Sequence, residues 1–280
     1  MIHPREAQDA AGVAAHYDEL DPFYRQVWGE HVHHGYWATG RESPAEAAEA
    51  LVALVAERLR LRPGLEVGDV GCGYGATAAH LAEHYGVQVT GLTLSAVQAA
   101  RAAARGLPRG VRVLVRDWLG NGLPDGCFDR LLAVESSEHM VDKARFFTEA
   151  HRTLRPGGRF VVCAWLAREG ARAWEVRHLL EPICREGRLP GMGTEAEYRA
   201  MAEEAGFRVA GVEDISRQVR ATWAVCLRRV AAGVATDPAY RRFLADARAR
   251  NRVFALTLAR LWLAYRAGAM RYVVLTLDRV

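Results

Sequence analysis

The chain has 280 residues, half of them hydrophobic, and a formal net charge of +4 at pH 7, which suits one large domain with a sizeable core. It contains no uncharged apolar run of about 18 residues, which argues against a membrane span, and its first residues lack the apolar segment of a signal peptide. The five cysteines form no C-x-x-C pair, so we expect buried thiols in a cytoplasmic protein. Lys143 is the only lysine beside many arginines, a usage typical of GC-rich bacterial genomes.

Hydrophobic periodicity and chain-breaking residues predict the elements in order. A helix is expected over residues 5–19. Ser43, Pro44 and Glu46 supply the N-cap, first-turn proline and acidic third position of a second helix, which runs to about residue 60. A strand over 65–70 then enters a glycine-rich turn, and a helix over 76–85 follows. The next strands are expected over 87–92, 111–115, 130–134 and 159–165, with helices over 95–105 and 143–154.

Strands that alternate with helices at this pace predict an α/β fold with a doubly wound, Rossmann-like parallel sheet. After residue 165 we expect irregular helices over 167–192, a helix over 195–205, a strand over 207–215, a helical insertion over 217–267 and a last strand over 271–277. This gives one seven-stranded domain with a core of about 44–166, 206–216 and 268–280. A mostly helical lid would comprise about 1–43, 167–205 and 217–267. The ligand should lie at the carboxyl ends of the strands.

The glycine-rich turn is the strongest local signal. Gly71, Gly73 and Gly75 follow Asp69 at every second position, and glycine allows a sharp bend and close approach of a ligand. The dinucleotide-binding fingerprint needs its third glycine three positions after the second, and a Walker loop needs a lysine, so neither fits. The turn therefore predicts a nucleoside site that also includes Cys72, whose thiol we expect to pack rather than react. A plain tight turn is the alternative.

Several segments together carry a family resemblance. They are Tyr17-Asp18, His31-Val32-His33-His34-Gly35-Tyr36-Trp37, the glycine turn, Val89 to Ser95 with Gln98, Glu135-Ser136-Ser137-Glu138-His139-Met140 and the tail 265–277. With them the chain resembles class I S-adenosylmethionine-dependent methyltransferases along most of its length. More narrowly, it is similar to the γ-tocopherol methyltransferase-like group, which is related to sterol methyltransferases, cyclopropane fatty acid synthases and plant alkaloid N-methyltransferases.

The resemblance implies a site for S-adenosylmethionine. The acidic residue that usually ends the second strand is here Thr93, so the nucleoside contacts would come from Thr93, Leu94 and Gln98. Asp117 would accept from the adenine amino group, for which a carboxylate is suited, and Trp118 would pack beside it. The segment from His31 to Trp37 would fold over the cofactor. The further cofactor contacts expected are His34, Tyr36 and Glu135.

Glu138 and His139 are the candidates for a general base, because a carboxylate and an imidazole can remove the proton of a methyl acceptor. Glu135 would support them or shape the pocket. The alternative is a helix-capping acid beside a structural histidine. The residues expected to bind the acceptor are Tyr17, Trp37, Trp165 and Trp223. No metal is expected, since nothing near His31, His33 and His34 completes a set of zinc ligands.

The last feature is a basic lid, with eleven arginines against two aspartates between Ser216 and Met270. It can be a solvated face, a site for an anionic acceptor or a surface attracted to anionic lipid. We expect a methyltransferase for a small, largely apolar metabolite of specialised, isoprenoid or phenolic metabolism. The alternatives are a prenyl diphosphate C-methyltransferase, with Mg²⁺ as a bridge, and an RNA-binding modification protein. We expect no nucleic-acid partner and no integral membrane association, and the sequence leaves a homo-oligomer open.

Overall fold

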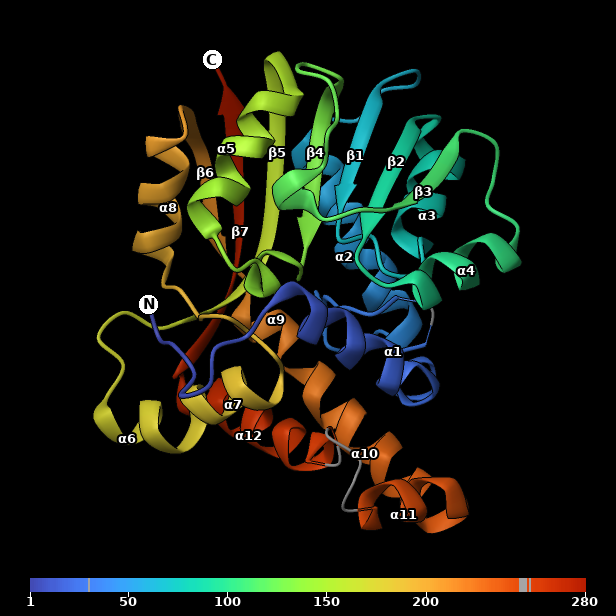
Figure 1. The fold of residues 1–280 in the computed structure, drawn as a ribbon, viewed down its shortest axis with the longest axis vertical. Helices are drawn as coiled ribbons and strands as arrows, with labels where there is room; N and C mark the ends of the chain where they lie inside the picture. Colours follow the sequence, from blue (N-terminus) through green and yellow to red (C-terminus); the bar gives the residue numbers. More distant parts are fainter. Residues whose placement is uncertain (30, 247–250, 252) are drawn as a thin grey trace.

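Seven strands form a single sheet in the computed structural model, which describes residues 1–29, 31–246, 251 and 253–280 (Figure 1). The strand order is β3-β2-β1-β4-β5-β7-β6, and β7 runs antiparallel to both of its neighbours while the other pairs are parallel. The predicted α/β, doubly wound fold is confirmed. The strands are β1 (Glu66–Val70), β2 (Gln88–Thr93), β3 (Val111–Val115), β4 (Phe128–Val134), β5 (Leu154–Ala167), β6 (Phe207–Asp214) and β7 (Met270–Arg279).

Helices cover both faces of this sheet. Alternate residues of β5 point to opposite faces, as the pleat of a strand requires. Cys163 therefore joins the core formed with α2 (Pro44–Leu59) and α3 (Ala76–Tyr85). Its neighbour Val162 joins the second core, formed with α5 (Lys143–Thr153) and α8 (Glu195–Glu204). The helix α4 (Ala96–Arg105) packs against β2 and β3.

The remaining helices gather at the carboxyl ends of the parallel strands (Figure 1). They are α1 (Ala10–Val27), α6 (Ala173–Glu175), α7 (Glu181–Glu186), α9 (Ser216–Val219), α10 (Ala221–Thr236), α11 (Pro238–Ala245) and α12 (Phe254–Ala267). We call this group, with the segments that join it, the lid. Its place at the ligand-binding edge of the sheet agrees with the expected fold. None of its described helices combines the length and the apolar character that a membrane crossing needs.

The predicted bounds of the first helix were wrong. The helix expected over 5–19 begins at Ala10 instead, because the side chain of Asp9 caps it by accepting from the Gly12 N–H at 2.7 Å. It continues through Pro22 to Val27. The predicted start of α2 is confirmed: Ser43 and Glu46 form a reciprocal capping box around Pro44.

Candidate active site

The glycine turn connects β1 to α3 and depends on its glycines. Gly71, Gly73 and Gly75 have φ angles of 81°, 54° and 73°, in the left-handed region that side chains with a Cβ disfavour. A Cβ on Gly71 would lie 2.3 Å from the Cβ of Ser136. A Cβ on Gly73 would meet no protein atom within 4 Å and would instead project into the hollow that this glycine lines. The turn is therefore shaped to leave room for a ligand.

That hollow extends over the ends of β2, β3 and β4, and we call it the cofactor cavity. It contains most of the residues expected to bind the cofactor: Gly71, Gly73, Thr93, Leu94, Gln98, Asp117, Trp118 and Glu135. The Thr93 hydroxyl donates to the Gln98 side-chain oxygen at 2.8 Å, which leaves the Gln98 amide NH₂ as a donor. Asp117 accepts from the Leu119 N–H through Oδ1 at 2.9 Å and retains Oδ2. Gly75 does not line the cavity but is the N-cap of α3.

A smaller cavity, lined by Asp69 and Cys72, adjoins the cofactor cavity at Gly71 and Gly73. Two buried polar atoms on its walls have no partner, Asp69 Oδ2 and His33 Nε2. Burial raises the pKa of Asp69 to about 7. The His33 Nδ1–H donates to the His34 carbonyl at 2.8 Å, so Nε2 carries a lone pair. Two unsatisfied acceptors suit a donor such as an ammonium group. His33 was not among the expected contacts.

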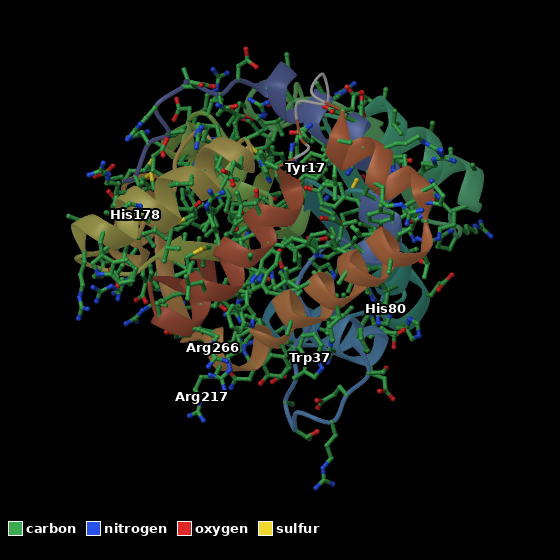
Figure 2. All side chains as sticks on the ribbon, turned by 90° about the horizontal axis from the view of Figure 1, so that it is seen from below. Tyr17, Trp37, His80, His178, Arg217 and Arg266 are labelled. Atoms are coloured by element: carbon green, nitrogen blue, oxygen red, sulfur yellow. The ribbon has the colours of Figure 1, made fainter. Side chains whose placement is uncertain are left out.

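The segment that follows His33 differs from the prediction. His34 is fully buried and lines neither cavity, and neither does Tyr36 or Trp37. The Gly35 N–H donates to Thr222 Oγ1 and the Trp37 N–H to the Gln218 carbonyl, which holds the segment against the lid with these side chains turned away. Figure 2 shows Trp37 near the outer edge of the lid. This placement differs from the expected cofactor contacts of His34 and Tyr36 and from the expected acceptor contact of Trp37.

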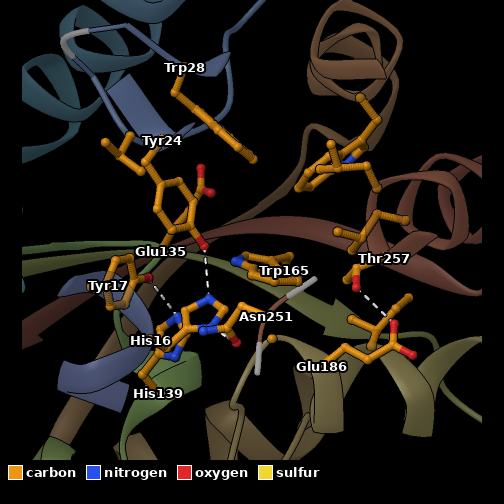
Figure 3. Close-up of a pocket in the computed structure, with 16 residues that line it drawn as sticks. His16, Tyr17, Tyr24, Trp28, Glu135, His139, Trp165, Glu186, Asn251 and Thr257 are labelled. Atoms are coloured by element: carbon orange, nitrogen blue, oxygen red, sulfur yellow. Dashed lines mark hydrogen bonds between the residues drawn. The ribbon is translucent and has the colours of Figure 1, made fainter. Parts of the chain in front are cut away.

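A second large cavity, which we call the acceptor cavity, lies between the sheet and the lid (Figure 3). It holds about 680 Å³ of space, part of it open to solvent. The expected residues Tyr17, Trp165 and Trp223 line it. Several other lining residues come from distant parts of the lid and were not predicted: His16, Tyr24, Trp28, Ile183, Glu186, Asn251, Thr257, Leu258 and Leu261.

The two cavities meet at four residues that line both: Tyr17, Val32, Glu135 and His139. A group in one cavity can therefore face a group in the other across this boundary. Glu135 adopts φ 55°, an uncommon conformation for a residue other than glycine.

Three donors hold Glu135 in place. The His34 N–H lies 2.6 Å and the Tyr272 hydroxyl 2.8 Å from its Oε1, and His34 Nδ1 lies 2.8 Å from its Oε2. Although burial opposes ionisation, the charge and hydrogen bonds of His34 hold the pKa of Glu135 below its ordinary value. Glu135 therefore presents an ionised carboxylate to both cavities.

His139 is the second titratable group at the boundary. Its Nε2 lies 2.9 Å from the Tyr17 hydroxyl, and its buried Nδ1 has no partner. Burial, together with the nearby His16 and Lys143, lowers the pKa of His139 to about 3. The imidazole is therefore neutral at pH 7 and has one nitrogen with a lone pair. In one tautomer this is Nδ1, which has no partner, and in the other it is Nε2, which accepts from the Tyr17 hydroxyl.

Glu138 does not line either cavity, which differs from the position expected of a base. Its Oε1 accepts from the Trp165 N–H at 2.7 Å and its Oε2 from the Ser137 hydroxyl at 3.2 Å. Burial raises the pKa of Glu138 to about 8. Lys143 extends the same scaffold, because its ammonium donates to the carbonyls of Glu138 and Met140, at 3.2 and 3.0 Å, on either side of His139.

A chain of hydrogen bonds joins α1 to Asn251, another residue of the lid, beside the acceptor cavity. The Asn251 amide donates to Glu19 Oε2 at 2.7 Å, so its oxygen faces His16 Nδ1 at 2.8 Å. His16 must then carry its proton on Nδ1 and accept from the Tyr24 hydroxyl at 3.0 Å through Nε2. Burial lowers the pKa of His16 to about 4, which keeps this neutral tautomer at pH 7.

The lid arginines of the described residues do not enter the acceptor cavity, whose charged lining consists of Glu135 and Glu186. Arg260 pairs with Glu186, and Arg229 donates to the Val27 carbonyl. Arg217 and Arg266 lie at the outer edge of the lid (Figure 2). Arg248, Arg250 and Arg252 lie outside the described residues.

The model of the mycolic acid cyclopropane synthetase family matches residues 4–244. The chain belongs to this family. It is thus a class I S-adenosylmethionine-dependent methyltransferase of the group that its motifs indicated, and S-adenosylmethionine is the cofactor that solved members of this fold bind.

Individual relatives agree with this assignment. The chloroplastic tocopherol O-methyltransferase of Arabidopsis thaliana is 32% identical over 78% of this chain. The 27-O-demethylrifamycin SV methyltransferase of Amycolatopsis mediterranei is 34% identical over 82% of this chain and 84% of its own length. The chain spans about two thirds of the plant relatives it matches, 65% of a rice protein and 68% of the Arabidopsis protein.

Two solved structures match nearly the full length of this chain. The mycolic acid cyclopropane synthase CmaA1, complexed with S-adenosylhomocysteine, has a TM-score of 0.85 and 25% identity, and covers 98% of this chain and 99% of its own. The [4+2]-cyclase SpnF has a TM-score of 0.80 and 29% identity, and covers 100% and 99%.

Proposed function

We propose that this protein transfers the methyl group of S-adenosylmethionine to a nucleophilic atom of a small, largely apolar acceptor. The boundary shared by the two cavities, at Tyr17, Val32, Glu135 and His139, is the observation that carries this proposal. When bound, the cofactor supplies a methyl group already activated on a sulfonium. The protein then needs chiefly to align the two reactants and to remove a proton.

Alignment comes from the smaller cavity and the cofactor cavity together. Asp69 Oδ2 and His33 Nε2 supply acceptors for an ammonium, and Gln98 and Asp117 supply a donor and an acceptor for a nucleoside. The absence of a Cβ at Gly73 leaves the space between them.

His139 takes the role of base. It is the neutral imidazole at the boundary, and Tyr17 at 2.9 Å from its Nε2 orients the ring. Glu135 stays ionised, so it stabilises positive charge at the boundary.

The prenyl diphosphate alternative finds no support in the described residues, since they bring no arginine or lysine to the acceptor cavity and form no cluster of His, Cys, Asp or Glu suited to a metal ion. We include a cytoplasmic, bacterial setting and a role in natural product biosynthesis in the proposal. The free cysteines, the arginine-rich composition and the bacterial relative that acts on a rifamycin precursor support it.

Calorimetry with S-adenosylhomocysteine tests the cofactor site. We expect Gly73→Val to lower the affinity at least roughly 100-fold, because the side chain fills the cavity. Gly40→Val is the matched control: Gly40 also has a positive φ, 80°, with nothing within 4 Å of a Cβ, but it lies outside both cavities. Equal losses in the two variants, or none in either, would contradict the assigned site.

Transfer itself is tested with methyl-labelled S-adenosylmethionine and a panel of apolar phenols, alcohols and amines. Label in an acceptor, dependent on His139, supports the proposal. Cofactor binding without transfer to any acceptor would favour a different reaction on the same fold, as the likeness to a cyclase illustrates.

A further inference from the structure

Beside the acceptor cavity lies a cluster of buried polar atoms without partners. They are Trp165 Nε1, Trp223 Nε1, the Tyr265 hydroxyl and His34 Nε2. The rings lie together, with centroid distances of 6.3 Å between the two tryptophans, 4.7 Å between His34 and Trp223, and 5.5 Å between His34 and Tyr265. Buried donors are rarely left unsatisfied in folded proteins, so the two indole N–H groups call for an explanation.

The two tryptophans connect this cluster to the cavity. Trp165 is 9% exposed and Trp223 is 4% exposed, and both line the cavity. Figure 3 shows the indole nitrogen of Trp165 turned toward the open space among the lining side chains. An indole N–H can only donate. The cavity lining mixes apolar side chains, such as Trp28, Ile183 and Leu258, with polar ones. Neither indole N–H has a hydrogen-bond partner among the described residues.

We infer that the indole N–H groups of Trp165 and Trp223 form a recognition site for an oxygen atom of the acceptor, such as a carbonyl, ether or hydroxyl oxygen. This inference rests on the proposed function, because it assigns the acceptor to this cavity. The methylated atom lies at the boundary beside His139, and the recognised oxygen lies at the tryptophan wall. The acceptor is therefore oxygenated away from its reacting atom.

The same arrangement discriminates against plain hydrocarbons. A ligand without an oxygen at this wall would still bury both indole N–H groups and leave them unpaired. Sites built to hydrogen-bond a ligand reject analogues that lack the matching group for this reason. Selectivity thus resides in two residues that do not touch the reacting atoms, so they are specificity residues and not catalytic ones.

The test uses two probes of the same shape, 2-acetylnaphthalene and 2-isopropenylnaphthalene, which differ by a C=O in place of a C=CH₂. They are titrated into ¹⁵N-tryptophan-labelled protein saturated with S-adenosylhomocysteine, and the indole N–H signals are followed by NMR. We expect the ketone to move the Trp165 and Trp223 signals downfield and to bind roughly tenfold more tightly than the alkene, as one or two hydrogen bonds would give.

Trp165→Phe and Trp223→Phe keep an aromatic ring but remove the donor, so each should reduce the preference for the ketone while leaving alkene binding within about twofold. Trp174→Phe is the control, since Trp174 is 46% exposed and lies outside the cavity. Equal affinity of the native protein for the two probes, including no binding of either, overturns the inference. Saturation with S-adenosylhomocysteine and methyl transfer are measured separately, so a failure of the proposed function is recognised independently.

Discussion

Replacing Glu138 by glutamine separates a buried structural carboxyl from a catalytic base. The carboxyl is 1% exposed, and burial raises its pKa from an ordinary value of 4.5 to about 8. Glutamine has the same shape and keeps an oxygen that can accept from the Trp165 N–H. We therefore expect Glu138→Gln to fold and to retain methyl transfer at neutral pH, within about threefold of the native protein.

The magnitude of its effect on stability follows from the pKa. An acid whose pKa is higher in the folded protein contributes stability that is fully present below pH 4.5 and is lost as the pH rises through 8. Each pH unit between these values corresponds to about 1.4 kcal/mol. The native protein should therefore lose up to about 5 kcal/mol of unfolding free energy over this range, relative to the variant.

Urea unfolding of the native protein and of Glu138→Gln at pH 5, 7 and 9 measures this difference in unfolding free energy. Glu135→Gln provides the contrast, because the pKa of Glu135 is lowered by His34. Its contribution is present above pH 4.5 and is lost as the pH falls through its folded pKa. Its loss should therefore destabilise the protein at neutral pH and matter less in acid. A difference between native protein and Glu138→Gln that does not change from pH 5 to 9 would show that Glu138 is ionised in the folded protein. A loss of turnover at pH 7 without a change in folding would restore Glu138 as the base.

Three further changes test the site. His139→Gln should lower kcat by about 10²- to 10⁴-fold through loss of the base, with S-adenosylhomocysteine affinity by calorimetry unchanged within about threefold; an unaltered kcat would exclude His139 as the base. Asp117→Asn keeps a carbonyl oxygen that can accept from the Leu119 N–H but loses the charged acceptor, so its Kd for the same ligand should rise roughly tenfold; an unchanged Kd would place the adenine elsewhere. Lys143→Met removes both hydrogen bonds to the carbonyls beside His139. It should lower the free energy of unfolding in urea by about 2–3 kcal/mol. Stability equal to that of the native protein would show that these bonds contribute little.

The fold and the cofactor cavity were largely predictable from local signals. Glycines at positions 71, 73 and 75 reflect backbone angles that few other residues adopt, and the residues after β2 and β3 follow them because parallel strands end at one edge of the sheet. Thr93, Gln98 and Asp117 line one cavity for that reason, and their contacts with the cofactor stay predictions.

The segment from His31 to Trp37 was predictable only in its location. His33 and His34 are adjacent, and the sequence does not say which of the two side chains faces the ligand. Tertiary hydrogen bonds to Thr222 and Gln218 decide it, and both partners lie far away in the chain. Trp37 was assigned to the acceptor for its aromatic character, but its indole N–H donates to the Glu42 carbonyl instead.

The acceptor cavity shows the same limit more strongly. Asn251 reaches His16 across 235 positions of sequence, and no short-range pattern marks such a contact. Glu138 is a third case: the motif placed it next to His139, but whether its carboxylate faces a cavity or the Trp165 backbone depends on the packing of β5.

Glu135 has a consequence for the two forms that the cofactor takes before and after reaction. Its carboxylate faces the cavities while His34 lies behind it, so the negative end of this pair attracts a sulfonium. The demethylated thioether has no positive charge to attract. The proposed function therefore implies a site that favours the reactant over the spent product, through a charge fixed in the protein.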